Sequence, residues 1–124
     1  MNNLIIEGTY KTPNVALHAD MGKLEFSGRS IPENSVEFYF PIGEWVEKYL
    51  ENPNEITTIM IKFEYFNTSS SKSMFEILKK FEKLFKSGKE VLVQWFYEQE
   101  DEDMQESGED FREILKIPFE LIVT

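Results

Sequence analysis

The stretch TTIMIKFEYFNTSSSKSMFEILKKFEKLFK, from Thr57 to Lys86, decides the fold of this chain. Its first ten residues are dense in β-branched and aromatic side chains that alternate between two faces, which predicts a central strand over 57–66. Apolar residues then recur at helical spacing opposite a row of lysines, which predicts a helix over 68–86. A strand that leads directly into an amphipathic helix indicates a βαβ unit with parallel strands.

The segment before this stretch predicts short strands and one helix. Apolar, β-prone residues indicate strands at 4–6, 15–17 and 23–27, with Gly22 in the turn of an antiparallel hairpin between the last two. The helix that follows contains Pro41. That proline either kinks a longer helix or occupies the first position of a shorter one, where its missing N–H costs nothing.

The segment after this stretch alternates strand and helix again. The apolar run VLVQWFY at 91–97 is typical of a strand covered on both faces. A helix over roughly 103–115 and a strand over 119–123 complete the order β, β, β, α, β, α, β, α, β. We therefore expect an α/β fold in one domain over 1–124, with a mixed sheet, an N-terminal antiparallel hairpin and about three helices.

Composition and charge exclude several classes of function. The 124 residues include 13 Lys and Arg against 23 Asp and Glu, a net charge of −10, so nucleic acid and anionic membrane surfaces are poor partners. No run approaches the roughly 18 apolar residues of a membrane span, and the N-terminus lacks the features of a secretory signal, so we expect a cytoplasmic protein. The absence of Cys excludes disulfides, thiol nucleophiles and Cys-ligated zinc, and His18 is the only histidine.

Most of the negative charge is local. Residues 98–124 contain 2 basic and 10 acidic groups, which invites a calcium interpretation. An EF-hand frame that starts at Asp103 places Gly108 correctly, but Ile114 stands where the bidentate glutamate belongs. We therefore favour a solvated acidic face and expect no metal site and no cofactor, with metal or small-ligand binding by this segment as an alternative.

A run of small polar residues links the predicted central strand to the helix after it. The sequence there is Asn67-Thr68-Ser69-Ser70-Ser71. One N-cap residue satisfies the free N–H groups of a helix, so capping alone does not require four consecutive hydroxyl groups. A helix N-terminus also tolerates a phosphate well, because its N–H groups and dipole attract negative charge. The loop is therefore either a cap only, or a cap that also accepts or binds a phosphate.

Five short motifs occur in order along nearly the whole chain. They are Gly-Thr-x-x-Thr-Pro (8–13), Gly-Arg-Ser with Pro-Glu-Asn (28–34), Tyr-x-Asn-Thr-Ser-Ser (65–70), Trp-x-Tyr (95–97), and Gly-Glu-Asp-Phe with Pro-Phe (108–119). Their order and spacing resemble the SiaC-type regulatory phosphoproteins, a bacterial family. The resemblance implies a single STAS-like domain and a non-enzymatic signalling protein that works by partner switching.

The resemblance also implies which residues carry the switch. A serine/threonine kinase would phosphorylate the threonine of the Asn-Thr-Ser-Ser motif, here Thr68, and a PP2C-type phosphatase would remove the phosphate. The unphosphorylated form would bind and activate an effector, a diguanylate cyclase, and so raise cyclic di-GMP and favour biofilm. The loop that shapes and caps the acceptor would be Asn67, Ser69, Ser70 and Ser71, and the expected partner contacts are Arg29, Ser30, Glu33 and Asn34. A constitutive interaction module, whose polar loop is only a cap, is the alternative.

Overall fold

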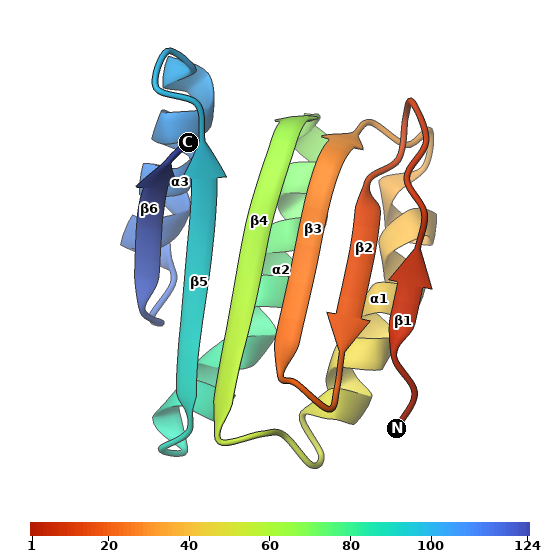
Figure 1. Cartoon of the computed structure of the whole chain (residues 1–124), viewed down its shortest axis with the longest axis vertical. Helices are drawn as coiled ribbons and strands as arrows, with labels where there is room; N and C mark the ends of the chain where they lie inside the picture. The colour runs from red at the N-terminus through yellow and green to blue at the C-terminus, as the bar shows by residue number, and fades with distance from the viewer.

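The strands follow one another across a single sheet in chain order, from β1 at one edge to β6 at the other (Figure 1). The computed structural model describes residues 1–124. Its elements are β1 (Leu4–Ile6), β2 (Asn14–His18), β3 (Lys23–Ser30), α1 (Ser35–Tyr49), β4 (Ile56–Phe66), α2 (Thr68–Lys86), β5 (Glu90–Tyr97), α3 (Glu102–Ile114) and β6 (Phe119–Val123). The order of strands and helices predicted from the sequence is confirmed.

The sheet is mixed, as the sequence predicts. Strands β1, β2 and β3 pair antiparallel, and Gly22, with a φ of 64°, turns the chain between β2 and β3. Strands β3, β4, β5 and β6 pair parallel, and each is joined to the next through a helix. The carboxyl ends of these four strands therefore lie at the same edge of the sheet.

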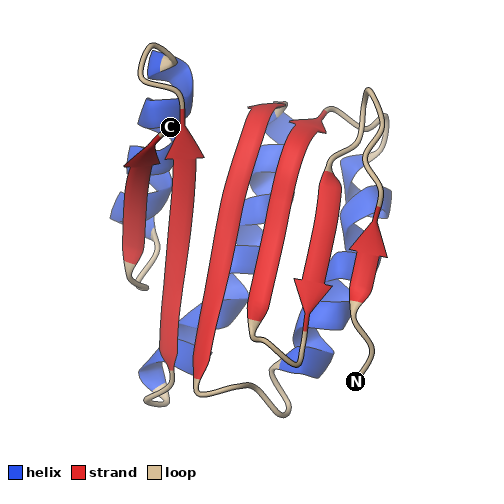
Figure 2. Ribbon diagram, viewed as in Figure 1, coloured by secondary structure: helices blue, strands red, loops and turns tan.

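All three helices cover the same face of the sheet, and the other face is open (Figure 2). Successive parallel strands are added in one direction only, and right-handed crossovers then place every helix on the same side. The expectation that β5 is covered on both faces is therefore wrong. Val91, Val93 and Trp95 are buried beneath the helices, whereas Leu92 and Gln94 lie half-buried on the open face.

The core lies between the sheet and the helices. It is built mainly from large apolar side chains that are fully buried, including Phe26, Ile42, Ile59, Leu78 and Trp95. Helix α1 begins at Ser35, so Pro41 lies inside it and the alternative of a shorter helix beginning at Pro41 is wrong. No helix has the length and apolar character that a membrane crossing requires.

Helix α3 lies against the sheet at a point where it has no side chain. A Cβ atom at Gly108 would lie only 2.6 Å from Cδ1 of Trp95 and 2.7 Å from Cδ2 of Leu121. The Trp95 indole N–H also donates a 3.0 Å hydrogen bond to the carbonyl oxygen of Met104, in the same helix. Trp95 therefore holds α3 against β5, and the absence of a side chain at residue 108 permits the close approach.

We predict that Gly108→Ala destabilises the protein by about 1–3 kcal/mol, because the overpacking at Trp95 outweighs the better helix propensity of alanine. Gly43→Ala is the matched control, since the atom nearest to its added Cβ would be Lys80 Cε at 4.0 Å. That variant should gain up to about 1 kcal/mol. Urea unfolding measures both, and equal stabilisation of the two variants would contradict the packing described for α3.

Candidate functional site

The polar segment at 67–71, which we continue to call the polar loop, lies where the carboxyl ends of two parallel strands meet, and its residues 68–71 form the first turn of α2. Ser30 at the end of β3 pairs with Phe66 at the end of β4, and the backbone N–H of Asn67 donates to the carbonyl oxygen of Ser30 at 3.1 Å. Helix α1 begins five residues after Ser30, so its N-terminus reaches the same edge. Ligand sites of parallel sheets commonly form at this edge.

Asn67 is the N-cap of α2. Its side-chain oxygen accepts a hydrogen bond from the backbone N–H of Ser70 at 2.9 Å and one from the Ser69 hydroxyl at 3.3 Å. The first turn of α2 contains no acidic residue, so nothing on the helix itself offsets the positive end of its dipole. The cap is thus provided by Asn67 alone, which leaves the hydroxyl groups of the loop for other contacts.

Four hydroxyl contacts join β3, α1 and the first turn of α2 to one another. The Ser30 hydroxyl lies 2.6 Å from the Tyr39 hydroxyl and 2.8 Å from that of Ser70, which also donates to the Ser30 carbonyl at 3.0 Å. The Ser35 hydroxyl lies 2.8 Å from that of Ser69. We call these five residues, Ser30, Ser35, Tyr39, Ser69 and Ser70, the hydroxyl cluster.

Burial of the hydroxyl cluster changes the acidity of its tyrosine. Loss of solvent raises the pKa of Tyr39 from 10.0 to about 12, and the hydrogen bonds to Ser30 and Ser70 oppose that rise only in part. Tyr39 is therefore neutral at physiological pH and keeps its O–H donor. A neutral, fully hydrogen-bonded cluster is a stable support for the start of α2.

Thr68 differs from its neighbours in the loop. Ser70 is completely buried, and the Ser69 hydroxyl, although exposed, is bonded to Ser35 and Asn67. Thr68 is exposed at the first position of α2, and its hydroxyl makes no hydrogen bond within the protein. The expected acceptor is therefore the one hydroxyl group among these three residues that is both exposed and unbonded.

Two of the expected partner residues reach the surface, Glu33 fully and Arg29 in part. The Arg29 guanidinium lies 5.4 Å from the ring centroid of Tyr10 and 5.9 Å from that of Tyr65, and its Nε is buried without a hydrogen-bond partner. The Glu33 side chain is 89% exposed and lies 3.8 Å from the Lys11 ammonium. Both side chains remain candidates for contact with a partner.

The other two expected partner residues have structural roles. The Asn34 side chain caps α1 by accepting from the backbone N–H of Glu37 at 3.0 Å. Ser30 is completely buried and bonded within the hydroxyl cluster, so it supports the fold of the free chain, and its contact with a partner stays a prediction. The strand expected at 23–27 extends to Ser30, and α1 and α2 cover this last residue of β3.

Two residues of the hydroxyl cluster, Ser35 and Tyr39, were not predicted from the sequence. Tyr39 is buried, whereas the neighbouring Phe38 is only partly buried. Ser35 and Tyr39 are four residues apart and therefore share one helix face. A serine at the first position of a helix with a tyrosine one turn later was the available signal for a polar contact under that helix.

The acidic segment forms a helix rather than a metal-binding loop. Asp101 caps α3 by accepting from the backbone N–H of Met104 at 3.0 Å, and Glu102 and Asp103 lie in the first turn, where the helix dipole favours negative charge. The EF-hand frame that starts at Asp103 falls within this continuous helix. The segment therefore has a structural explanation that requires no ion.

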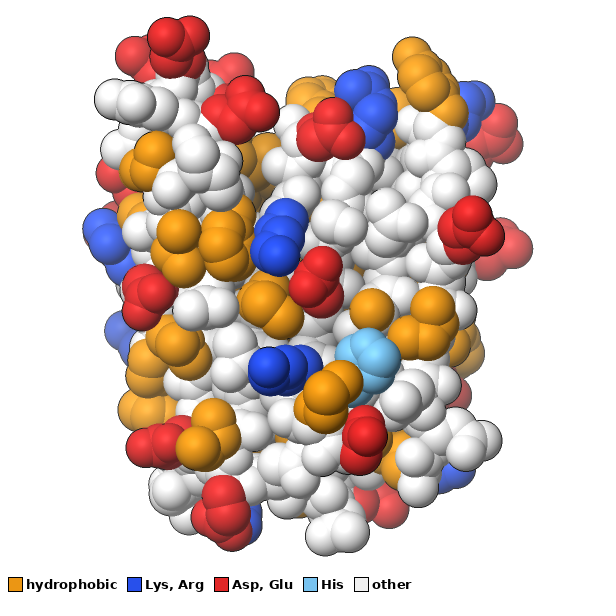
Figure 3. Space-filling model, in the orientation of Figure 1, with side chains coloured by type: hydrophobic (Ala, Val, Ile, Leu, Met, Phe, Trp, Pro, Cys, Tyr) orange, Lys and Arg blue, Asp and Glu red, His pale blue; other side chains and the backbone are white.

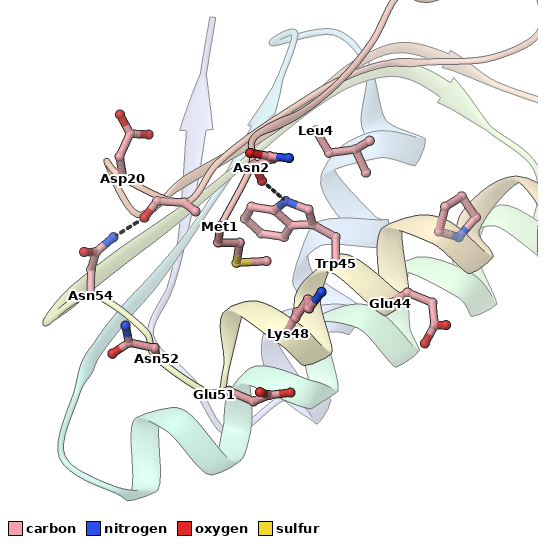
Figure 4. Close-up of a pocket in the computed structure, with 12 residues that line it drawn as sticks. Met1, Asn2, Leu4, Asp20, Glu44, Trp45, Lys48, Glu51, Asn52 and Asn54 are labelled. Carbon is pink, nitrogen blue, oxygen red and sulfur yellow. Dashed lines mark hydrogen bonds between the residues drawn. The ribbon is translucent and has the colours of Figure 1, made fainter.

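A large hollow lies at the other end of the strands from the polar loop. Its volume is about 910 Å³, and it opens between the N-terminal residues, the second half of α1 and the loop before β4 (Figure 4). Within it, the Trp45 indole N–H donates a hydrogen bond to the carbonyl oxygen of Asn2 at 2.9 Å. The Asn54 side-chain amide donates one to the carbonyl oxygen of Ala19 at 2.7 Å. No serine, threonine or histidine lines it, so it places no hydroxyl nucleophile beside a base.

Comparison with known proteins gives one consistent family. A curated relative, an uncharacterized protein of Pseudomonas aeruginosa strain UCBPP-PA14, is 35% identical over 119 residues, which cover 96% of this chain and 94% of the relative. The solved structure of SiaC of Pseudomonas aeruginosa superposes with a TM-score of 0.91 at 32% identity and covers 100% of both chains.

A second solved structure contains that relative bound to a protein partner. The crystal structure of the diguanylate cyclase SiaD in complex with its activator SiaC from Pseudomonas aeruginosa contains a chain that matches with a TM-score of 0.92 at 34% identity. The match covers 98% of this chain and 99% of that one. The family model of the SiaC family regulatory phosphoproteins matches residues 6–124, and this chain belongs to that family.

Proposed function

We propose that this chain is a non-enzymatic cytoplasmic regulator that phosphorylation of Thr68 switches between two binding states. The observation that carries the proposal is the state of the loop hydroxyl groups. Thr68 is exposed and unbonded, whereas Ser69 is bonded, Ser70 is buried and Ser71 is half-buried. A kinase needs an accessible hydroxyl group, and Thr68 offers one without disruption of the hydroxyl cluster.

The position of Thr68 at the start of α2 suits a reversible phosphate. Phosphorylation adds a charge of about −1.5 to −2 and three acceptor oxygens. At the first position of a helix with no acidic residue in its first turn, that charge meets free N–H groups and the positive end of the dipole. The folded chain therefore tolerates the phosphate, and the effect of the phosphate falls on whatever docks at this edge.

The effector that we propose is a diguanylate cyclase. A relative that matches 98% of this chain at 34% identity crystallised with the cyclase SiaD, of which it is the activator. The unphosphorylated form of this chain binds and activates such a cyclase, raises cyclic di-GMP and favours biofilm. A serine/threonine kinase and a PP2C-type phosphatase set the balance between the two forms.

Thr68→Ala should abolish phosphorylation by the cognate kinase and leave the fold intact. Because Asn67 is the cap, the free energy of unfolding should change by no more than about 0.5 kcal/mol. Ser69→Ala is the matched control and should keep a single +80 Da species at Thr68. Intact-mass and peptide mass spectrometry measure both variants, and a stoichiometric phosphate on the Thr68→Ala protein would contradict the assignment of the acceptor.

Affinity for the cyclase should follow the charge on residue 68. Wild type and Thr68→Ala should bind alike, Thr68→Glu more weakly, and the phosphothreonine form most weakly, because a carboxylate has fewer oxygens and less charge than a phosphate. Calorimetric titration of the four forms with purified SiaD measures the order. If phosphoprotein and Thr68→Ala bind equally well, the phosphate is not the switch, and a constitutive interaction module explains the chain better.

The hydroxyl cluster predicts a pH dependence at its tyrosine. The pKa of Tyr39 is raised to about 12 in the folded chain, so its contribution to stability is complete below pH 10 and is lost as the pH rises from 10 to 12. Two pKa units correspond to at most about 2.7 kcal/mol. Urea unfolding from pH 8 to 11.5 should therefore show a steeper loss for wild type than for Tyr39→Phe, and parallel curves would argue against a buried, neutral Tyr39.

A further inference from the structure

Strand β6 leaves one edge of the sheet without a partner. It pairs with β5 alone and is the last strand of the sheet (Figure 1). The carbonyl oxygen of Pro118 and the backbone N–H of Thr124 are both bonded to β5. Because alternate residues of a strand turn their backbone groups to the same side, the free side carries the N–H and C=O groups of Phe119, Leu121 and Val123.

This edge lacks the features that usually protect an edge strand. Such strands are commonly very short, or contain a proline, a lysine or a bulge. Strand β6 spans 5 residues in regular register with β5, and its one charged side chain is that of Glu120. The opposite edge strand, β1, spans only 3 residues. The free backbone groups of β6 therefore form the longer of the two open edges of the sheet.

The surroundings of this edge are strongly acidic. Residues 98–124, which form the loop after β5, α3 and β6, contain 10 acidic and 2 basic groups, and none of these carboxylates forms an ion pair within the chain. Acidic side chains gather over the loop after β5 in Figure 3 (upper left). The helix dipole favours those at the start of α3, but not Glu109, Glu113 or Glu120, which lie further along the chain.

We propose that the free edge of β6 docks an extended, basic segment of a protein partner, which adds to the sheet as a further strand. The backbone of that segment bonds to the free N–H and C=O groups of Phe119, Leu121 and Val123. Its lysine or arginine side chains lie over the carboxylates around the edge, so the backbone provides affinity and the charges select the partner. This surface is separate from Thr68, because β5 lies between β6 and β4, the strand that leads to Thr68.

The charges favour such a segment over a second copy of the chain. Two copies that paired edge to edge through β6 would bring the same acidic residues together, and like charges oppose association. An extended basic segment complements both the unpaired backbone and the charge of this edge. A dimer in analytical ultracentrifugation that Val123→Pro abolishes would assign the edge to a second copy and overturn the inference.

The test titrates the full chain with a blocked synthetic peptide of about seven residues in which lysine and valine alternate. Binding should be saturable and should weaken as the salt concentration rises, because charge contributes to the affinity. Amide hydrogen exchange of the complex should show new protection of Phe119, Leu121 and Val123, whose N–H groups are free in the chain alone. No saturable binding at millimolar peptide, or protection confined to other elements, would overturn the inference.

Two control peptides separate strand pairing from charge. A peptide of the same sequence that is N-methylated at every residue keeps its charges but has no backbone donors, so it should bind at least about ten-fold more weakly. A peptide with glutamate in place of each lysine should not bind, because its charges repel the acidic edge. Equal binding of the methylated peptide would mean that the contact is general attraction to an acidic surface, and strand addition would be wrong.

Val123→Pro is the matched change in the chain. It removes one N–H group from the free side of β6 and leaves the bonds to β5 in place, and the side chain is 51% exposed, so the core is not opened. The peptide should bind about three- to ten-fold more weakly, as expected for one lost hydrogen bond. Val123→Thr keeps the N–H group and should bind within about two-fold of wild type. Equal affinity of the two variants, at equal melting temperatures, would argue against backbone pairing at this edge.

Thr68→Glu separates this inference from the proposed function. It should bind the peptide as tightly as wild type, since residue 68 does not lie at the free edge of β6. If Thr68→Glu loses the peptide, the peptide binds at the polar loop and the inference is overturned. If the peptide binds at β6 but phosphorylation of Thr68 leaves the affinity for the cyclase unchanged, the edge site stands and the switch fails.

Discussion

The parallel pairing of β3 with β4 is the constraint on which the rest of the structure depends. It forces the chain to cross the sheet through α1 and brings the ends of both strands to one edge. Ser30 at the end of β3 therefore meets Ser70 in the first turn of α2, 40 residues later. The buried contact between these two hydroxyl groups fixes the N-terminus of α2, and with it the position of Thr68, relative to the sheet and to α1 (Figure 1).

In this arrangement, the residues that hold the start of α2 in place are different from the residue proposed to be phosphorylated. The hydroxyl cluster is buried or bonded and holds the start of α2, while the Thr68 hydroxyl has no role in the fold. The proposed phosphate would meet a helix N-terminus that tolerates negative charge, so it would change the surface and leave the scaffold unchanged. The open face of the sheet has a different character, since apolar and charged side chains are interspersed across it (Figure 3).

The strands and helices could be predicted from the sequence because their patterns are strong. Side chains at 57–66 alternate between two faces, and apolar residues at 68–86 recur at helical spacing opposite a row of lysines. The sequence did not predict that β5 is covered on one face only, since that depends on the direction in which strands are added to the sheet. It also did not predict that Ser30 is buried. The Ser30 hydroxyl bonds to Tyr39 and Ser70, which are 9 and 40 residues away in the chain. Its burial therefore depends on the tertiary structure, and no local sequence pattern predicts it.

The central claim is that phosphate on Thr68 removes the ability of the chain to activate its effector. The most direct measurement is the rate of cyclic di-GMP formation by a purified diguanylate cyclase in the presence of the chain, before and after stoichiometric phosphorylation. The account predicts that the unphosphorylated chain stimulates the cyclase and that the phosphorylated chain does not. Equal stimulation by the two forms would contradict it.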